Sequence, residues 1–114
     1  MFIAMNRFKI VKGREDDFET VWRTRDSRLA DVPGFVEFHL LRGPEVETHT
    51  LFASHTIWKD EAAFVAWTKS DAFKQAHAGA GETRGMYIGH PEFEGFKAVM
   101  QSLPADASSH VLDA

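Results

Sequence analysis

Residues 35–58, FVEFHLLRGPEVETHTLFASHTIW, decide the fold because they place two strands in succession between two helical segments. In Phe35–Arg42, apolar and polar side chains alternate, as in a strand with one buried face. Thr48–Trp58 is rich in Thr, Leu, Phe, Ile and Trp, which favour strands. Gly43-Pro44-Glu45 begins the turn between them. The pattern therefore predicts two neighbouring strands in the middle of the chain.

The segment before this pair predicts a strand followed by a helix. Phe2–Val11 alternates apolar and charged side chains, and Lys12-Gly13 closes it. A helix is expected over Arg14–Asp31, where acidic residues occupy the first turn and Pro33-Gly34 follows the last. Its apolar stripe consists of Phe18, Val21, Trp22 and Leu29.

The segment after the pair predicts two short helices and one more strand. Asp60 and Ser70 each stand where a helix N-cap is expected. Ala78–Pro91 is a glycine-rich loop of a length that is usually functional or mobile. The last strand is expected over Glu92–Gln101, with Gly95 marking a bulge or a close backbone approach.

The element order is therefore β-α-β-β-α-α-β, which is the ferredoxin-like α+β pattern. It predicts a four-stranded antiparallel sheet with helices on one face. We expect one domain over residues 1–102 and a flexible C-terminal tail over 103–114. Several strands carry apolar residues on both faces, and no element remains to cover the second face. An exposed apolar face indicates an interface, so a homodimer packed through this face is expected.

Composition excludes several classes of function. The chain has 114 residues, 13 Lys and Arg against 17 Asp and Glu, and no Cys. The missing Cys excludes disulfides, thiolate metal sites and a Cys nucleophile. The net charge of −4 gives no basic footprint for nucleic acid. No apolar run is long enough for a membrane span, and the first residues lack signal-peptide features, so a cytoplasmic location is expected.

Three polar residues lie where the apolar pattern predicts a hydrophobic side chain. Asn6 falls on the apolar face of the first strand, Arg25 on the stripe of the first helix, and His77 on the apolar face of the third helix. Each has an ordinary explanation: a hydrogen-bonded core amide, an Arg whose head reaches water, and a core His bonded to a carbonyl. Each could also face a pocket, where imidazole is the usual proximal ligand of haem iron.

Trp67 precedes His77 by ten residues across a helix break, so both side chains could face one cavity. As an isolated residue, Trp67 is more often part of a core. The chain has no His-Glu-x-x-His, no glycine-rich phosphate loop and no Gly-x-Ser-x-Gly. Zinc hydrolysis, nucleotide chemistry and acyl transfer at a serine therefore have no support.

From Phe2 to Gln101 the chain resembles the IsdG-type haem-degrading monooxygenases of the antibiotic biosynthesis monooxygenase superfamily. The most specific match is residues 67–77, WTKSDAFKQAH. Asn6, the Pro33-Gly34-Phe35 turn and residues 58–64, WKDEAAF, also match. Many members of the superfamily share the turn, whereas Asn, Trp and His together at these positions distinguish the haem degraders.

The resemblance implies a role for each of these residues. His77 would ligate haem iron, Asn6 would donate a hydrogen bond to dioxygen on the distal side, and Trp67 would distort the porphyrin. The remaining haem contacts would come from Arg25, Phe73 and Ala76. Haem would be both cofactor and substrate, and its ring would be opened by O2 to a linear tetrapyrrole with release of iron.

The resemblance also implies a dimer whose two sheets close into an α+β barrel. The chain has no flavin or nicotinamide motif, so electrons would come from an external reductase or small reductant. The loop Ala78–Pro91 would then be a lid over the haem.

Two alternatives remain open. One is a cofactor-independent monooxygenase acting on quinols or polyketide-like aromatics, since relatives with this function share the fold. The other is a haem carrier or sensor without catalysis.

Overall fold

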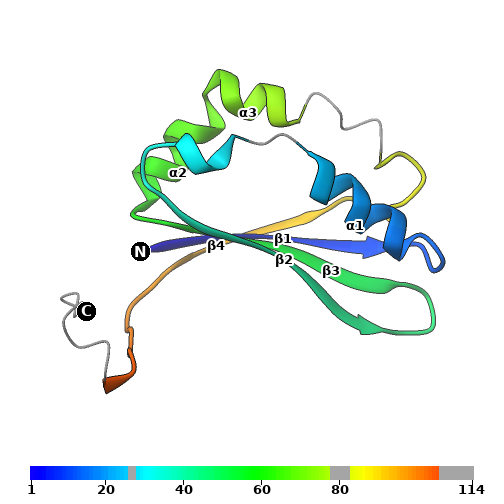
Figure 1. The fold of residues 1–114 in the computed structure, drawn as a ribbon. Helices are drawn as coiled ribbons and strands as arrows, with labels where there is room; N and C mark the ends of the chain where they lie inside the picture. The colour runs from blue at the N-terminus through cyan, green and yellow to red at the C-terminus, as the bar shows by residue number, and fades with distance from the viewer. Residues whose placement is uncertain (26–27, 78–82, 106–114) are drawn as a thin grey trace.

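The computed structural model describes residues 1–25, 28–77 and 83–105. The elements are, in chain order, β1 (Phe2–Ile10), α1 (Glu15–Thr24), the short 3-10 helix η1 (Leu29–Asp31), β2 (Phe35–Glu45), β3 (Thr50–Trp58), α2 (Glu61–Thr68), α3 (Asp71–Ala76) and β4 (Glu92–Lys97). The strands form one antiparallel sheet in the order β2-β3-β1-β4, and the helices cover one of its faces (Figure 1). The predicted α+β fold and element order are confirmed.

The first helix is shorter than the apolar stripe predicts. It ends at Thr24 and not at Asp31, and the C-cap Arg25 has extended backbone with ψ of 129°. Leu29 continues the stripe from η1, where it packs against the sheet as a helical residue would. The periodicity was therefore produced by two separate elements.

The last strand is also shorter than predicted, ending at Lys97 and not at Gln101. Lys97 pairs with Phe2, the first residue of β1. One further hydrogen bond joins the amide of Ala98 to the carbonyl of Met1. The strand therefore ends where its pairing with β1 ends. The predicted start of the strand, at Glu92, was correct.

The two predicted N-caps are confirmed. The Asp60 side chain accepts a hydrogen bond of 2.8 Å from the amide of Ala63. The Ser70 hydroxyl accepts one of 3.2 Å from the amide of Phe73. These caps fix two consecutive short helices and, with them, the positions of the side chains between Trp67 and His77.

The predicted loop Ala78–Pro91 has two parts. Residues 78–82 lie outside the described residues. From Thr83 onward the segment is fastened to the sheet, because Met86 is buried and its carbonyl accepts a hydrogen bond of 2.8 Å from the amide of Val11. A second such bond joins the amide of Ile88 to the carbonyl of Lys9. The expectation that the whole loop forms a lid was wrong for residues 83–91.

The buried side chains form two clusters, one at each end of the sheet. One contains Phe8, Ile10, Phe18, Phe52 and Met86 beneath α1. The other contains Phe2, Ala4 and Trp58 beneath α2. Along β1 the two clusters are separated by a single inward-facing position, which is Asn6.

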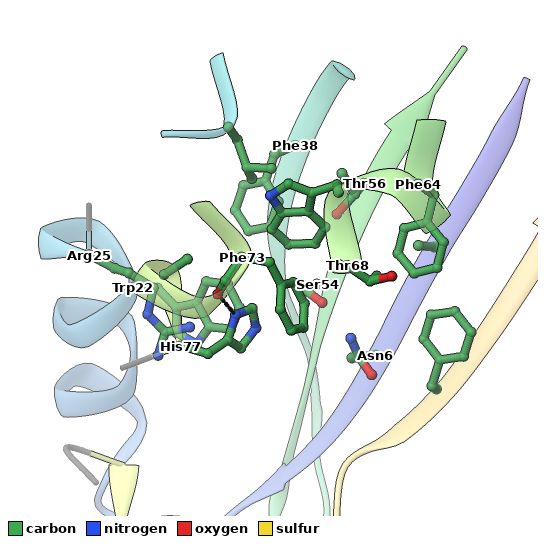
Figure 2. A pocket seen from close by; sticks show the side chains of 15 residues that line it. Asn6, Trp22, Arg25, Phe38, Ser54, Thr56, Phe64, Thr68, Phe73 and His77 are labelled. Carbon is green, nitrogen blue, oxygen red and sulfur yellow. Dashed lines mark hydrogen bonds between the residues drawn. The ribbon is translucent and has the colours of Figure 1, made fainter. Parts of the chain in front are cut away.

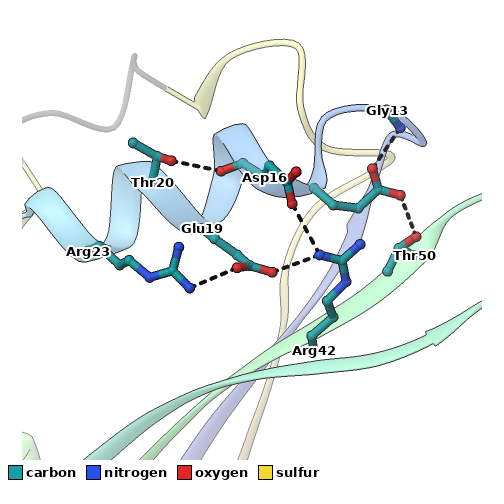
Figure 3. Close-up of polar contacts among 8 residues, drawn as sticks. Gly13, Asp16, Glu19, Thr20, Arg23, Arg42 and Thr50 are labelled. Atoms are coloured by element: carbon teal, nitrogen blue, oxygen red, sulfur yellow. Dashed lines mark hydrogen bonds and ion pairs between the residues drawn. The ribbon is translucent and has the colours of Figure 1, made fainter.

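Polar contacts fasten α1 to β2 and β3 (Figure 3). Arg42 of β2 donates to Glu19 at 2.9 Å and to Asp16 at 3.4 Å. The Thr50 hydroxyl of β3 donates to Glu15 at 2.8 Å. The bond from Thr50 is the main cause that lowers the pKa of Glu15 below its usual range. These contacts fix the distance of α1 from the sheet and so the height of the space beside it.

The other face of the sheet is not covered by any described element (Figure 1). Register places six large apolar side chains on it, namely Ile3, Met5, Leu41, Leu51, Ile57 and Phe96. Leu41 is 42% exposed and Phe96 is 43% exposed. Among the described residues, no helix has the length and apolar character needed to cross a membrane.

Candidate functional site

A pocket of about 280 Å³ lies between the sheet and the helices, at the gap between the two core clusters (Figure 2). Its floor comes from the strands and includes Ala4, Asn6, Phe38, Ser54, Thr56 and Phe93. Its roof comes from the helices and includes Trp22, Arg25, Leu29, Phe64, Trp67, Thr68, Phe73, Ala76 and His77. All six predicted site residues therefore line one pocket.

Asn6 lies at the centre of the floor. It pairs with Ser54 of β3 on one side and with Phe93 of β4 on the other. Its amide makes no side-chain hydrogen bond to any other described residue. A core amide of the ordinary kind would have found a protein partner, so the Asn6 amide is available to a ligand in the pocket.

His77 lies on the roof as the C-cap of α3. Its Nδ1 donates a hydrogen bond of 2.8 Å to the carbonyl of Phe73, because a carbonyl can only accept (Figure 2). In the neutral ring, the other nitrogen, Nε2, then carries a free lone pair. A backbone carbonyl on one ring nitrogen is the arrangement that orients a histidine for binding a metal through the other. His77 is exposed at its helix terminus, so it is not the buried core histidine of the ordinary explanation.

Aromatic rings support His77 and wall the pocket. The Phe73 ring lies 4.1 Å from the His77 ring, centroid to centroid, at 31°. Trp67 packs edge-on against Phe73 at 4.8 Å and lies 6.0 Å from His77. Ala76 is buried and small, which leaves space beside the imidazole. These neighbours restrict the His77 ring without occupying its Nε2.

Arg25 lies at the edge of the pocket. Its guanidinium stacks over the Trp22 ring, 4.4 Å from the centroid. The structure thus places Arg25 at the predicted pocket, but from the helix C-cap and not from the helical stripe. Among the described lining residues it is the only one with a permanent charge.

Sequence reasoning missed two polar residues of the floor. Ser54 and Thr56 are buried, and their backbone pairs with that of Asn6 and Ala4. The signal was present in β3, where they interrupt the inward-facing series between Phe52 and Trp58. Together with Asn6 they make the pocket floor polar in the region between the two core clusters.

The walls also contain donors without partners. The indole Nε1 atoms of Trp22 and Trp67 are buried and have no hydrogen-bond partner among the described residues. Trp22 stacks on Phe38 at 5.6 Å and 13°, forming one flat wall. Flat apolar walls, an amide without a partner among the described residues and one orientated imidazole suit a planar ligand that carries a metal.

The same pocket offers no conventional metal site. No group of three or more His, Asp or Glu side chains that could hold an ion occurs among the described residues. An ion at His77 must therefore bring most of its own ligands, as iron in a porphyrin does.

Residues 1–79 match the family model of the antibiotic biosynthesis monooxygenases. The chain belongs to this family. A curated relative, the "Heme oxygenase (staphylobilin-producing) 1" of Staphylococcus aureus strain Newman, is 34% identical over 76 residues, covering 67% of this chain and 70% of the relative.

Two solved structures show the range of chemistry found on this architecture. The heme degrader MhuD of Mycobacterium tuberculosis, with two hemes bound in its active site, has a TM-score of 0.70 and 25% identity, covering 90% of this chain and 99% of MhuD. SnoaB of Streptomyces nogalater, a cofactor-independent oxygenase, has a TM-score of 0.63 and 27% identity, covering 90% of this chain and 96% of SnoaB. The expected resemblance to haem-degrading monooxygenases is confirmed, and the fold alone does not separate the two activities.

Proposed function

We propose that this family member is a haem-degrading monooxygenase that uses O2 and electrons from an external donor. One observation carries the proposal. The His77 imidazole lies on the roof of the pocket with Nδ1 fixed by Phe73, and the Asn6 amide lies on the floor; neither Nε2 of His77 nor the Asn6 amide has a partner among the described residues. The relative named heme oxygenase and the heme-bound neighbour support the same substrate.

In this proposal each side chain has a distinct task. Haem supplies the iron that activates dioxygen and the ring carbon that is oxidised. His77 would hold the iron through Nε2. The Asn6 amide would donate a hydrogen bond to bound dioxygen, and because an amide does not readily release a proton, it would orient the oxygen without protonating it. Trp67, supported by Phe73, would contact the macrocycle.

The pocket of about 280 Å³ lies just below the usual range of pocket volumes for organic ligands. Haem is larger than a typical ligand of that range, so one edge of it stays outside or side chains at the mouth move. Arg25 is the residue best placed to move, since within the described part of the chain its guanidinium is held by one stacking contact, on Trp22.

The test combines purified protein, haem, a reductant and air, with catalase present to remove free peroxide. We expect the Soret band to disappear, a linear tetrapyrrole to appear by mass spectrometry, and iron to become available to a chelator. A Soret band that persists under turnover conditions contradicts the proposal. Tight haem binding without ring opening would instead identify a carrier.

Two variants assign the roles. His77→Ala should lose the spectrum of the histidine-ligated iron, while His90→Ala, an exposed histidine outside the pocket, should keep it. Asn6→Ala should still bind haem but degrade it about 100-fold more slowly, the usual cost of removing one well-placed donor. Degradation at the normal rate in Asn6→Ala would remove the role proposed for the amide.

The likeness to SnoaB favours one second candidate, a cofactor-independent oxygenase acting on an aromatic quinol. The polar floor of Asn6, Ser54 and Thr56 could bind the hydroxyl groups of such a substrate. Oxygen uptake with a hydroquinone in strictly haem-free protein would establish this candidate, and its absence would reject it.

We also propose that the open sheet face pairs with a second copy of the chain. The six apolar side chains on this face would be removed from water by such pairing. The pocket lies on the opposite face, so each copy keeps its own site.

A further inference from the structure

The open face of the sheet also carries two histidines that lie side by side. His39 of β2 and His55 of β3 are direct cross-strand partners. Their Nδ1 atoms are 3.5 Å apart, and their ring centroids are 5.6 Å apart. Because the two histidines are sixteen positions apart in the sequence, local spacing does not reveal the pair. The pocket of the proposed function does not include either residue.

A carboxylate determines which nitrogen of His39 is available. The Nε2 atom of His39 lies 2.7 Å from Oε2 of Glu37. In the neutral ring this contact requires the hydrogen to be on Nε2, which leaves the lone pair on Nδ1, the atom that faces His55. A carboxylate on the far nitrogen of a ligating histidine is the usual second shell of a protein metal site.

The separation of the two nitrogens fits a tetrahedral ion. With Zn–N bonds of 2.0–2.1 Å, two ligands at the tetrahedral angle are roughly 3.3 Å apart. Adjacent ligands in a square plane would be only about 2.8 Å apart. At 3.5 Å the Nδ1 atoms are close to the first value and are long for a hydrogen bond between the two rings.

We propose that His39 and His55 bind one divalent transition-metal ion of tetrahedral preference, with Zn²⁺ as the best fit and Glu37 as the second-shell carboxylate. Since no third ligating side chain completes the group among the described residues, water or a second copy of the chain fills the remaining positions. His39 is exposed in the single chain, so an ion can enter before this face pairs with a second copy.

The test uses the untagged full-length protein, freed of metal, and titrates Zn²⁺ by calorimetry. Co²⁺ serves as a second probe, because tetrahedral Co²⁺ absorbs visible light much more strongly than octahedral Co²⁺. We expect a stoichiometric site with the tetrahedral Co²⁺ band. One ion per chain indicates completion by water, and one ion per two chains indicates completion by a second copy. Failure to bind Zn²⁺, both by the native protein and after refolding with Zn²⁺ present, overturns the proposal.

Three variants test which histidines bind the ion. His39→Ala and His55→Ala should each abolish the tetrahedral Co²⁺ band, whereas His90→Ala should leave it unchanged. Equal loss in all three, or no loss in the first two, overturns the assignment. Because haem degradation uses the other face of the sheet, each variant is also tested for haem binding, which should be normal.

Glu37→Ala tests the second shell. It should weaken Zn²⁺ binding by about 10-fold, as removal of an outer-shell carboxylate usually does. Nitrogen chemical shifts of His39 should show the Nε2–H tautomer in the wild type and a mixture of tautomers in Glu37→Ala. Unchanged tautomer and affinity would contradict the role assigned to Glu37.

Discussion

Asn6 occupies the one inward-facing position of β1 that separates the two core clusters. A valine there would join the clusters and remove an amide that has no partner among the described residues. We therefore expect Asn6→Val to raise the free energy of unfolding by about 1 kcal/mol while haem degradation is lost. Binding sites commonly show this trade-off, in which a substitution that raises stability lowers activity.

The measurement is urea unfolding of the haem-free protein, with activity followed in parallel. Lys9→Val is the matched control, since it introduces the same strand-favouring residue at an exposed position of the same strand. If Asn6→Val is less stable than Lys9→Val, the amide has a structural partner and the argument for an available donor fails.

Gly95 shows the effect of a single missing side chain. A Cβ added at this position would lie 2.7 Å from Cζ of Phe2, whose ring is buried. Gly95→Ala should therefore lower the free energy of unfolding by about 1–3 kcal/mol, as overpacking of a core usually does. Thermal unfolding measures the loss.

The same substitution in a Phe2→Leu background should cost clearly less, because the shorter side chain gives way. Equal costs in the two backgrounds would show that the ring contact is not the reason for the glycine. Sequence alone indicated a bulge or a close approach at Gly95, and the structure identifies the close approach.

At the scale of elements, the contact between α1 and β3 is sensitive to acid. The Thr50 hydroxyl lowers the pKa of Glu15, so folding favours the charged carboxylate. Such a group stabilises the folded state above its unfolded pKa, and the contribution is lost as the pH falls through the folded pKa. Thr50→Val should therefore be less stable than wild type at neutral pH, and the difference should shrink below the usual glutamate range.

Urea midpoints measured at a series of pH values test this expectation. Thr48→Val is the control, since the Thr48 hydroxyl contacts His49 and, among the described residues, no carboxylate. A stability difference for Thr50→Val that stays constant from neutral pH into the acid range would refute the link to Glu15.

The elements also show where a sequence pattern stops being informative. Asp60 and Ser70 were predictable because N-capping is local, and the caps alone define the two short helices. The end of α1 was not predictable, because Leu29 continues the helical spacing although it belongs to a separate 3-10 helix. The end of β4 depends on the first residue of β1, a partner far away in the sequence.

The candidate site shows the same division. Asn6 and His77 could be found because each breaks a local apolar pattern. Ser54 and Thr56 break theirs too, but only the register of β3 against β1 shows that they lie beside Asn6. The pairing of His39 with His55 depends wholly on register.

At the scale of the whole molecule, the open sheet face predicts the state of assembly. Leu41 and Phe96 keep about two-fifths of their surface exposed in the single chain. Light scattering after size exclusion should give the mass of a dimer, and Leu41→Glu or Phe96→Glu should shift it toward the monomer, because a buried carboxylate without a partner is costly.

Val65→Glu is the control for this experiment. Val65 is 38% exposed on α2, on the opposite side of the sheet, so its charge should leave the dimer intact. A monomeric wild-type protein, or dissociation by Val65→Glu alone, would contradict assembly through the open face.

The division of the core at Asn6 has a consequence for local unfolding of the protein. The buried residues that the structure describes form two separate hydrophobic clusters on one sheet, and such clusters can open separately. We expect amide hydrogen exchange in the haem-free protein to show two levels of protection, one for α1 and another for α2 with α3. A bound planar ligand bridges both clusters, so it should bring the two levels together and make the protein exchange as one unit.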